Sequence, residues 1–199
     1  MLPVPVARLP VHGEVVSGWV TYCSNLEAPQ MLMWNMHQAF EIEAVLHGHH
    51  ERHHEGLVRV PEAGDASLVP AWEPHGYRSL TSDTVLLVVF FLPEFLGDEV
   101  LGDVSWLSLF VAAPDERPSV TSADMRSRVL AITAELRREI EAGGEQAPGY
   151  ITAMRLGVLQ LLFTLSRRWK PPKSVGMRSR ARPSRSADVS LVPSPAGAA

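Results

Sequence analysis

The first half of the chain alternates short apolar, β-branched runs with turn-forming residues. The runs are Val15 to Tyr22, Gln30 to His37, Phe40 to Leu46, Leu57 to Val60, Ala66 to Val69 and Thr84 to Leu92. Turn-forming pairs such as Glu55-Gly56, Gly64-Asp65 and Glu73-Pro74 separate them. The last run is apolar on both faces, which is typical of a central strand. Short strands at such close intervals predict a small all-β barrel or sandwich.

After Ser119 the apolar residues recur at helical spacing. They are Met125, Val129, Ile132, Leu136 and Ile140. This stripe predicts a helix over residues 121–142, which ends before Gly143-Gly144. A second predicted helix, residues 150–169, is apolar over much of its circumference, so we expect it to pack on more than one partner. Its own core is one partner and a second copy of the chain is another; packing on the core alone is the alternative.

Charge is distributed unevenly along the chain. Residues 1–166 carry 10 Arg against 21 Asp and Glu, whereas residues 167–199 carry eight Lys and Arg against one Asp. The acidic part would repel nucleic acid, and no aromatic residue follows Trp169 in the basic part to stack on bases. Residues 170–199 are rich in Pro, Ser, Ala, Gly and Arg, and we expect them to be disordered.

Length and composition predict one soluble domain. The 199 residues are 46% hydrophobic, enough for a single core, and contain no run of eighteen apolar residues. The first residues lack the basic region and apolar block of a secretory signal, and the lone Cys23 has no internal partner for a disulfide. We therefore expect a cytoplasmic protein without a membrane span.

Polar residues that can bind a metal or a small molecule occur in two segments of the chain, around Asn35 to Glu41 and at His75. Asn35, His37 and Glu41 have odd numbers, so along one strand their side chains project to the same face. A returning hairpin can bring His75 opposite them. Two imidazoles, a carboxylate and an amide oxygen are ligands that a divalent transition metal accepts. The sequence therefore predicts one site made of these four residues.

The same strand has a simpler interpretation. Between Trp34 and Leu46 the even positions are nearly all apolar and the odd ones mostly polar, so the even face would lie in the core and the odd face in water. We also expect a solvent-exposed hairpin, and no site, between Leu46 and Gly56. That segment contains His47, His49, His50, His53 and His54.

The spacing of the polar residues resembles the paired signatures of the cupin superfamily. The first signature is His-x-His, three residues, Glu, six residues, Gly; here it spans Asn35 to Gly48. The second is Gly, five residues, Pro-x-Gly, two residues, His; here it spans Gly64 to His75. Asn35 stands where the first His belongs, and Trp72 where the family usually has Gly.

The order of strands followed by two helices is similar to the N-terminal sensor and dimerisation domain of AraC-type transcriptional regulators. The resemblance covers residues 12–169. It implies a mainly β fold with a cupin-like barrel (double-stranded β-helix) over residues 12–118 and a two-helix dimerisation region over residues 119–169. A disordered tail, residues 170–199, would follow.

This resemblance implies a small-molecule effector, such as a sugar, in a pocket lined by Asn35, His37, Glu41 and His75. The helix pair would form a homodimer through an antiparallel coiled coil, and no cofactor is expected. Such regulators continue into two helix-turn-helix units, whereas residues 170–199 lack a periodic apolar pattern. We therefore expect no direct DNA binding by this chain. The alternative is a small metal-dependent cupin enzyme, an isomerase or dioxygenase, with a divalent transition metal on His37, Glu41 and His75.

Overall fold

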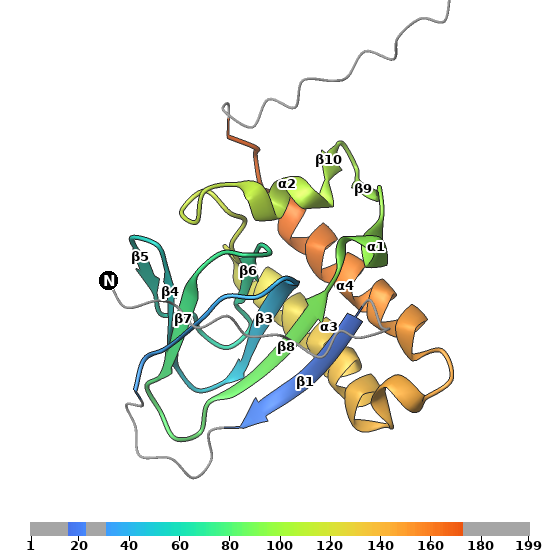
Figure 1. The fold of residues 1–199 in the computed structure, drawn as a ribbon, viewed down its shortest axis with the longest axis horizontal. Helices are drawn as coiled ribbons and strands as arrows, with labels where there is room; N and C mark the ends of the chain where they lie inside the picture. The colour runs from blue at the N-terminus through green and yellow to red at the C-terminus, as the bar shows by residue number, and fades with distance from the viewer. Residues whose placement is uncertain (1–15, 23–30, 173–199) are drawn as a thin grey trace, which may run out of the picture.

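Two antiparallel sheets and two long helices form most of the molecule (Figure 1). The computed structural model describes residues 16–22 and 31–172. Cys23 and nearly all of the basic tail lie outside these residues. The first sheet has the strand order β1 (Val16–Tyr22), β8 (Val85–Phe91), β3 (Phe40–His47) and β6 (Ala66–Val69). The second sheet has the order β2 (Met33–Asn35), β7 (His75–Ser79), β4 (His50–His54) and β5 (Leu57–Arg59).

Strand β8 is the centre of the first sheet, as its apolar sequence predicts. It pairs antiparallel with β1 on one side and with β3 on the other, so that Phe91 lies opposite both Val16 and Phe40. Six of its seven residues are buried. The prediction of a central strand over residues 84–92 is confirmed, and the fold is mainly β as expected.

Helical segments follow the strands. They are α1 (Pro93–Leu96), α2 (Trp106–Val111), α3 (Ala123–Glu141), the 3-10 turn η1 (Gly144–Gln146) and α4 (Tyr150–Ser166). A short hairpin, β9 (Val100–Leu101) and β10 (Val104–Ser105), lies between α1 and α2. The side chain of Ser122 caps α3 by accepting a hydrogen bond from the backbone N–H of Met125. None of the described helices is long and apolar enough to cross a membrane.

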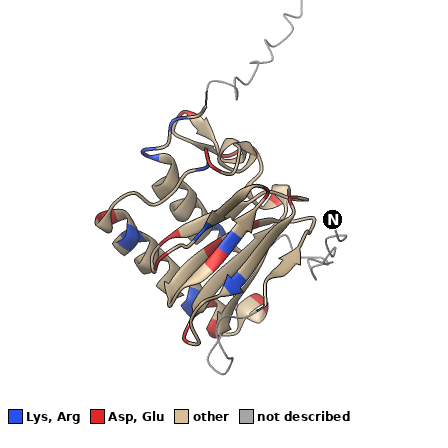
Figure 2. Cartoon of the chain, turned by 90° about the vertical axis from the view of Figure 1, so that its left-hand side faces the viewer, with Lys and Arg blue, Asp and Glu red and all other residues tan. Residues whose placement is uncertain are grey.

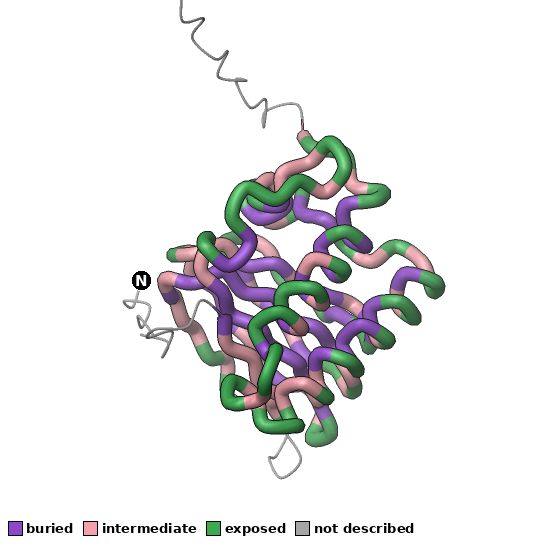
Figure 3. Tube along the Cα trace, turned by 90° about the vertical axis from the view of Figure 1, so that its right-hand side faces the viewer, coloured by how far each residue is buried: buried purple, intermediate pink, exposed green. Residues whose placement is uncertain are grey.

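The helices cover one face of the first sheet, and the second sheet faces the other. Even-numbered residues of β3 and odd-numbered residues of β8 join the helices in the main core, as Ile42 and Val89 do. In Figure 3 the helices are exposed on their outer side and buried on the side that packs against the rest of the chain. The even face thus lies in the core as predicted. The alternative interpretation, in which the odd face lies in water, is wrong, because Glu41 and Glu43 are each 3% exposed.

The apolar stripes of α3 and α4 pack on their own chain. Met125, Val129, Ile132 and Leu136 are buried in the main core, and Ile140 packs against it. On α4, Leu161 and Leu165 are 0% and 1% exposed. For Leu161 and Leu165 the alternative interpretation, packing on the core of their own chain alone, therefore holds. Apolar residues of α4 that remain exposed are Ile151, Leu156 and Phe163.

Candidate functional site

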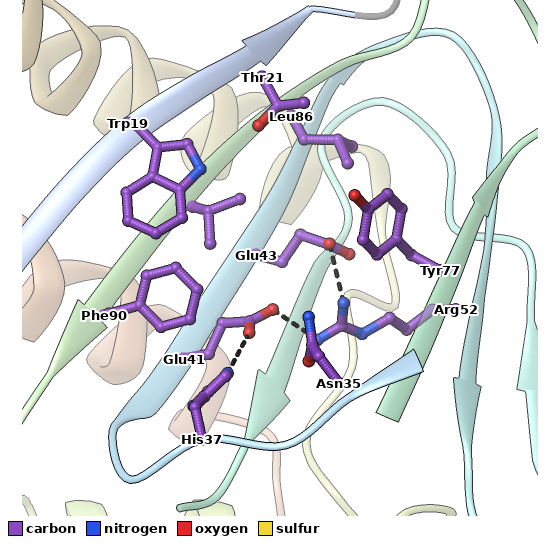
Figure 4. Close-up of a pocket in the computed structure, with 11 residues that line it drawn as sticks. Trp19, Thr21, Asn35, His37, Glu41, Glu43, Arg52, Tyr77, Leu86 and Phe90 are labelled. Carbon is purple, nitrogen blue, oxygen red and sulfur yellow. Dashed lines mark hydrogen bonds and ion pairs between the residues drawn. The ribbon is translucent and has the colours of Figure 1, made fainter. Parts of the chain in front are cut away.

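A polar cluster lies between the two sheets, on the face of the first sheet that the helices leave uncovered (Figure 4). Glu41 and Glu43 project from β3 toward the second sheet, where Arg52 projects from β4. His75 begins β7, and Asn35 ends β2 directly opposite it. Strand alternation explains this arrangement, since the odd residues Glu41 and Glu43 of β3 face the second sheet.

The structure brings His37, Glu41 and His75 together. Both Nε2 atoms lie near the same carboxylate oxygen, Glu41 Oε2, at 2.9 Å for His37 and 3.3 Å for His75. The ligand atoms of the three side chains all lie within 4.8 Å of one another, and all three residues are buried. Asn35 lines the same cavity, and its buried Oδ1 has no hydrogen-bond partner among the described residues.

Backbone carbonyls orient both imidazole rings. His37 Nδ1 lies 2.9 Å from the Ala39 carbonyl oxygen, and His75 Nδ1 lies 2.7 Å from that of Glu73. A carbonyl oxygen only accepts, so each Nδ1 carries a hydrogen and each ring presents Nε2 to the centre of the cluster. Metal-binding imidazoles are commonly held in this way, because the second nitrogen fixes the ring and its tautomer.

The histidine-rich segment contributes residues that sequence reasoning missed. His50, Arg52 and His54 lie on β4, an inner strand between β7 and β5, and all three are buried. The prediction of a solvent-exposed hairpin is therefore wrong for them, although His47 and His49 are exposed. The only signal was parity: even residues of β4 point inward, while the odd residues Glu51 and His53 point outward. Charged residues on both faces hide such a pattern.

Outward-facing residues of the second sheet are charged as well, so the alternation along β4 does not stand out in the sequence. Acidic and basic residues lie side by side on its strands (Figure 2). Glu51 on β4 lies opposite Arg78 on β7 and accepts hydrogen bonds from its Nε and Nη2 at 3.0 and 2.6 Å. This outer pair is an ordinary cross-strand contact, whereas the inner charges are enclosed.

Arg52 joins the two carboxylates of β3. Its Nη2 donates to Glu41 Oε1 at 2.5 Å and its Nη1 to Glu43 Oε2 at 3.0 Å. His50 Nε2 lies 2.8 Å from the other oxygen of Glu43. Burial alone would raise the pKa of Glu41, but Arg52 and hydrogen bonds from His37 and His75 hold it well below its usual range.

The pKa of Glu43 is also lowered. Burial opposes ionisation there too, yet the charges of Arg52 and His50 outweigh it. Both carboxyl groups are therefore ionised at neutral pH. The cluster is a buried ionic network in which two carboxylates share one guanidinium.

A cavity of about 130 Å³ opens beside this network. One wall is apolar and comes from the first sheet: Trp19, Leu86, Val88 and Phe90. The other wall is polar and contains Asn35, His37, Glu41, Glu43 and Arg52, with Thr21 and Tyr77 beside them. An engineered cavity of about 150 Å³ binds benzene, so this one can hold a compact molecule of about six heavy atoms.

A second, partly buried ionic contact adjoins the cluster. Arg117, in the loop before α3, donates to both carboxylate oxygens of Glu73, and His54 Nδ1 lies 2.8 Å from Glu73 Oε1. Burial opposes ionisation of Glu73, but the hydrogen bonds from Arg117 and His54 lower its pKa to about 2. Because the Glu73 carbonyl also orients His75, Arg117 is connected to the cluster through a single residue. No motif in the sequence marked Arg117.

Trp72 adopts a left-handed backbone conformation, with φ of 64°. Its N–H donates to the carbonyl oxygen of His37 at 2.7 Å, so the turn before β7 is fixed to the chain beside the cluster. Trp72 occupies the position where the cupin signature usually has Gly, and the observed φ explains why glycine suits that position.

Comparisons with known proteins give structural neighbours only. No family model matches the chain, and no curated protein matches it. An RmlC-like cupin from Shewanella frigidimarina NCIMB 400 is 20% identical, with a TM-score of 0.34 over 38% of this chain and 65% of that one. The AraC-like transcriptional activator CuxR is 12% identical, with a TM-score of 0.43 over 63% of this chain and 42% of that one.

A third neighbour is an enzyme. The DMSP lyase DddQ from Ruegeria pomeroyi DSS-3 is 26% identical, with a TM-score of 0.36 over 40% of each chain. In all three alignments this chain spans less than two thirds of the solved chain. TM-scores of 0.43 or lower are too small to support an argument about function. The function of this chain must therefore be inferred from the side chains of the cluster and the cavity.

Proposed function

We propose that this chain is the effector-binding and dimerising part of an AraC-type transcriptional regulator. The effector, a small molecule, would occupy the cavity between the two sheets and contact Asn35, His37 and Glu41, with His75 behind them. Residues 12–118 would form the binding domain and residues 119–169 the dimerisation region. The order of the elements in the sequence, strands followed by a helix pair, supports this assignment.

One observation carries the proposal: the cavity combines an apolar wall with unpaired, buried polar atoms. Buried polar groups in folded proteins are nearly always hydrogen-bonded, so Asn35 Oδ1 without a described partner suggests a ligand or ordered water. An apolar surface with a few fixed polar groups is also the usual composition of small-molecule sites. Packing alone would not require the charged residues that line this cavity.

A homodimer is the second part of the proposal. Leu156, Leu159 and Phe163 lie at spacings of three and four on α4, the spacing of a coiled-coil seam. Leu156 and Phe163 are exposed, and Leu159 is half-buried. Two copies of this face would bury apolar side chains that the chain itself leaves in water.

The effector site is tested by thermal unfolding of the protein with a panel of small neutral, cationic and anionic molecules. A ligand of the cavity raises the unfolding temperature, and the rise grows as the ligand concentration exceeds the dissociation constant. Thr21, half-buried on β1, lines the cavity, so Thr21→Phe should block the cavity and abolish the rise, while Thr21→Ser retains it. Equal stabilisation of the blocked and unblocked proteins would show that the ligand binds elsewhere.

A metal-dependent cupin enzyme is the alternative, and the geometry of His37, Glu41 and His75 favours it. Two imidazoles whose Nε2 atoms both face one carboxylate match the ligand set of non-haem iron, manganese or nickel sites. Such a metal would polarise or activate a substrate when bound. Against this, Glu41 already pairs with Arg52, which lowers its affinity for a cation, and Asn35 replaces a histidine.

Elemental analysis of the purified protein separates the two functions. Stoichiometric iron, manganese or nickel that is lost in His37→Ala would support the enzyme. Protein that contains no metal and is stabilised by an organic effector would support the regulator. The variant His47→Ala is the matched control, because His47 is exposed and distant from the cluster.

A further inference from the structure

Every carboxylate oxygen that lines the cavity between the two sheets already has a nitrogen beside it. The oxygens of Glu41 lie 2.5 Å from Arg52 Nη2 and 2.9 Å from His37 Nε2. Those of Glu43 lie 3.0 Å from Arg52 Nη1 and 2.8 Å from His50 Nε2. Among the described lining residues, no carboxylate oxygen and no terminal guanidinium nitrogen is left for a charged ligand. Such a ligand would bury its charge without a partner, which is costly.

Two buried side-chain atoms on the polar wall of the cavity lack a hydrogen-bond partner among the residues that the structure describes. They are Asn35 Oδ1, which accepts, and Arg52 Nε, which carries a hydrogen and donates (Figure 4). Buried polar atoms are rarely left unpaired, so this wall suits a group that both donates and accepts. A hydroxyl is such a group, whereas an ether oxygen only accepts and an ammonium only donates.

The opposite wall of the cavity is apolar. Leu86, Val88 and Phe90 belong to a second apolar cluster, on the face of the first sheet that the helices leave uncovered, and Trp19 packs against it. The rings of Trp19 and Phe90 stack with their centroids 4.5 Å apart. A sugar carries a hydroxyl on nearly every carbon and would bury several of them against this wall without partners. A hydrocarbon ring suits the wall better, because its burial there is favourable.

From these features we propose that the ligand of the cavity is an uncharged ring compound with a single hydroxyl, an alicyclic alcohol or a phenol. The inference rests on the proposed function, because it gives the effector a chemical class, and it replaces the sugar that the resemblance implied. The hydroxyl has Asn35 Oδ1 as its acceptor and Arg52 Nε as its donor, while the ring lies on Trp19 and Phe90. The cavity volume of about 130 Å³ limits the molecule to about six heavy atoms.

Four probes of similar size separate charge from hydrogen bonding: cyclopentanol, its isomer tetrahydropyran, cyclopentylamine and cyclobutanecarboxylate. Their binding to the full chain is measured by NMR titration of isotopically labelled protein at neutral pH. Cyclopentanol should bind roughly tenfold more tightly than tetrahydropyran, whose oxygen has no hydrogen and leaves Asn35 Oδ1 buried and unpaired. The amine and the carboxylate should bind more weakly than either isomer, because each buries a charge.

Asn35→Leu tests the contact with the amide. The variant should fold, because leucine has nearly the shape of asparagine and Asn35 Oδ1 has no described partner to lose. Arg52 Nε can still donate to either isomer, so both should bind and the preference for cyclopentanol should disappear. Gln146→Leu is the matched control, since it removes an exposed amide on η1 and should keep the preference. An unchanged preference in Asn35→Leu would overturn the assignment.

The natural protein tests the same contact without a substitution. Its spectrum resolves the side-chain amide of Asn35, and that signal should shift with cyclopentanol and far less with tetrahydropyran. Equal shifts with the two isomers would contradict a hydrogen bond to this amide.

The other outcomes separate this inference from the proposed function. A charged probe, or D-xylose as a sugar, that binds as tightly as cyclopentanol and is blocked by Thr21→Phe would overturn the assigned class and leave the effector cavity in place. Cyclopentanol that still binds to Thr21→Phe would lie outside the cavity and overturn the inference. If none of the probes binds, the inference fails, and the wider panel with Thr21→Phe decides the effector site by itself.

Discussion

At the scale of single residues, Glu73 connects the cluster to the rest of the molecule. Its carboxylate is held by Arg117 and His54, and its carbonyl orients His75. Arg117 also donates to the carbonyl oxygens of Leu68, Phe110 and Ala112. One guanidinium therefore ties the first sheet, α2 and the loop before α3 to the turn that positions the cluster.

This contact predicts a specific dependence of stability on pH. The pKa of Glu73 is lowered from 4.5 to about 2, so its carboxylate stabilises the folded state above pH 4.5. That contribution, about 2 kcal/mol after allowance for partial exposure, is lost as the pH falls from 4.5 to 2. Urea unfolding at a series of pH values measures it.

Arg117→Met tests the assignment to Glu73. The variant should lose about 2 kcal/mol at pH 7, because it leaves the partly buried carboxylate of Glu73 without its guanidinium partner. It should also lose less further stability in acid than the natural protein does, even though Glu41 and Glu43 still titrate. Arg137→Met removes an exposed pair with Glu141 and should change neither quantity appreciably. Identical acid sensitivity in Arg117→Met and the natural protein would contradict the assignment.

Trp72 provides a test of backbone conformation. At ordinary positions an alanine is more stable than a glycine, but a left-handed φ of 64° penalises any Cβ. We therefore expect Trp72→Gly to be more stable than Trp72→Ala by about 1 kcal/mol in thermal unfolding. Comparing the two variants with each other removes the effect of losing the indole ring. A more stable alanine variant would show that the turn relaxes to another conformation.

Only some residues of the site could be predicted from the sequence. His37, Glu41 and His75 were predicted because strand parity and motif spacing both selected them. Arg52 and His50 were not, since a strand with charged residues on both faces has no apolar periodicity to reveal its buried side. Arg117 depends on a contact with Glu73, 44 positions away in the sequence, that no local pattern specifies.

At the scale of elements, the approach of α3 to α4 depends on a glycine. A Cβ on Gly157 would lie 2.4 Å from Cδ2 of Leu136, so the helices meet where only hydrogen fits. Gly157→Ala should therefore destabilise the protein by about 1–3 kcal/mol, although alanine is the better helix former.

A double-mutant cycle checks this explanation. Leu136→Ala alone should cost about 2–5 kcal/mol as a cavity in the core. In the double variant the new methyl group occupies space that Leu136 has vacated, so the combined loss should be smaller than the sum of the two single losses. Additive losses in chemical denaturation would exclude direct contact as the cause.

Elements with strong periodicity could be predicted, and short ones could not. The apolar stripe marked α3 within a few residues, and β8 was recognisable from its continuous apolar run. Helix α2, Trp106–Val111, was missed because six apolar-rich residues without a side-chain cap could equally form a strand. Its place in the core is set by tertiary packing against α4 and the sheet.

At the scale of the whole molecule, the layers explain both the stability and the site. The helices bury one face of the first sheet in an apolar core, and the second sheet encloses charges on the other. The sequence predicted that one face of β3 is apolar and lies in the core, while the other face is polar. It did not predict which apolar residues of α4 would stay exposed, because α4 is covered by α1, α2 and α3, whose packing no local pattern specifies.

The burial of Leu161 and Leu165 changes how a homodimer must be tested. Charged residues at Leu161 or Leu165 would unfold the chain, since both lie in its core. The exposed pair Leu156 and Phe163 is the proper target. In sedimentation experiments, the double substitution Leu156→Glu with Phe163→Glu should convert a dimer into a folded monomer, whose circular dichroism matches that of the natural protein.

The control for this change is a pair of equally exposed apolar residues on another surface. Val58 and Val60, at and after β5, are 56% and 52% exposed, compared with 57% and 42% for Leu156 and Phe163. Val58→Glu with Val60→Glu should leave the dimer intact, because β5 lies at the edge of the second sheet, away from the helices. If the natural protein sediments as a monomer at tens of micromolar, roughly the range of a weak dimer, then α4 serves its own chain alone and the dimerisation proposal fails.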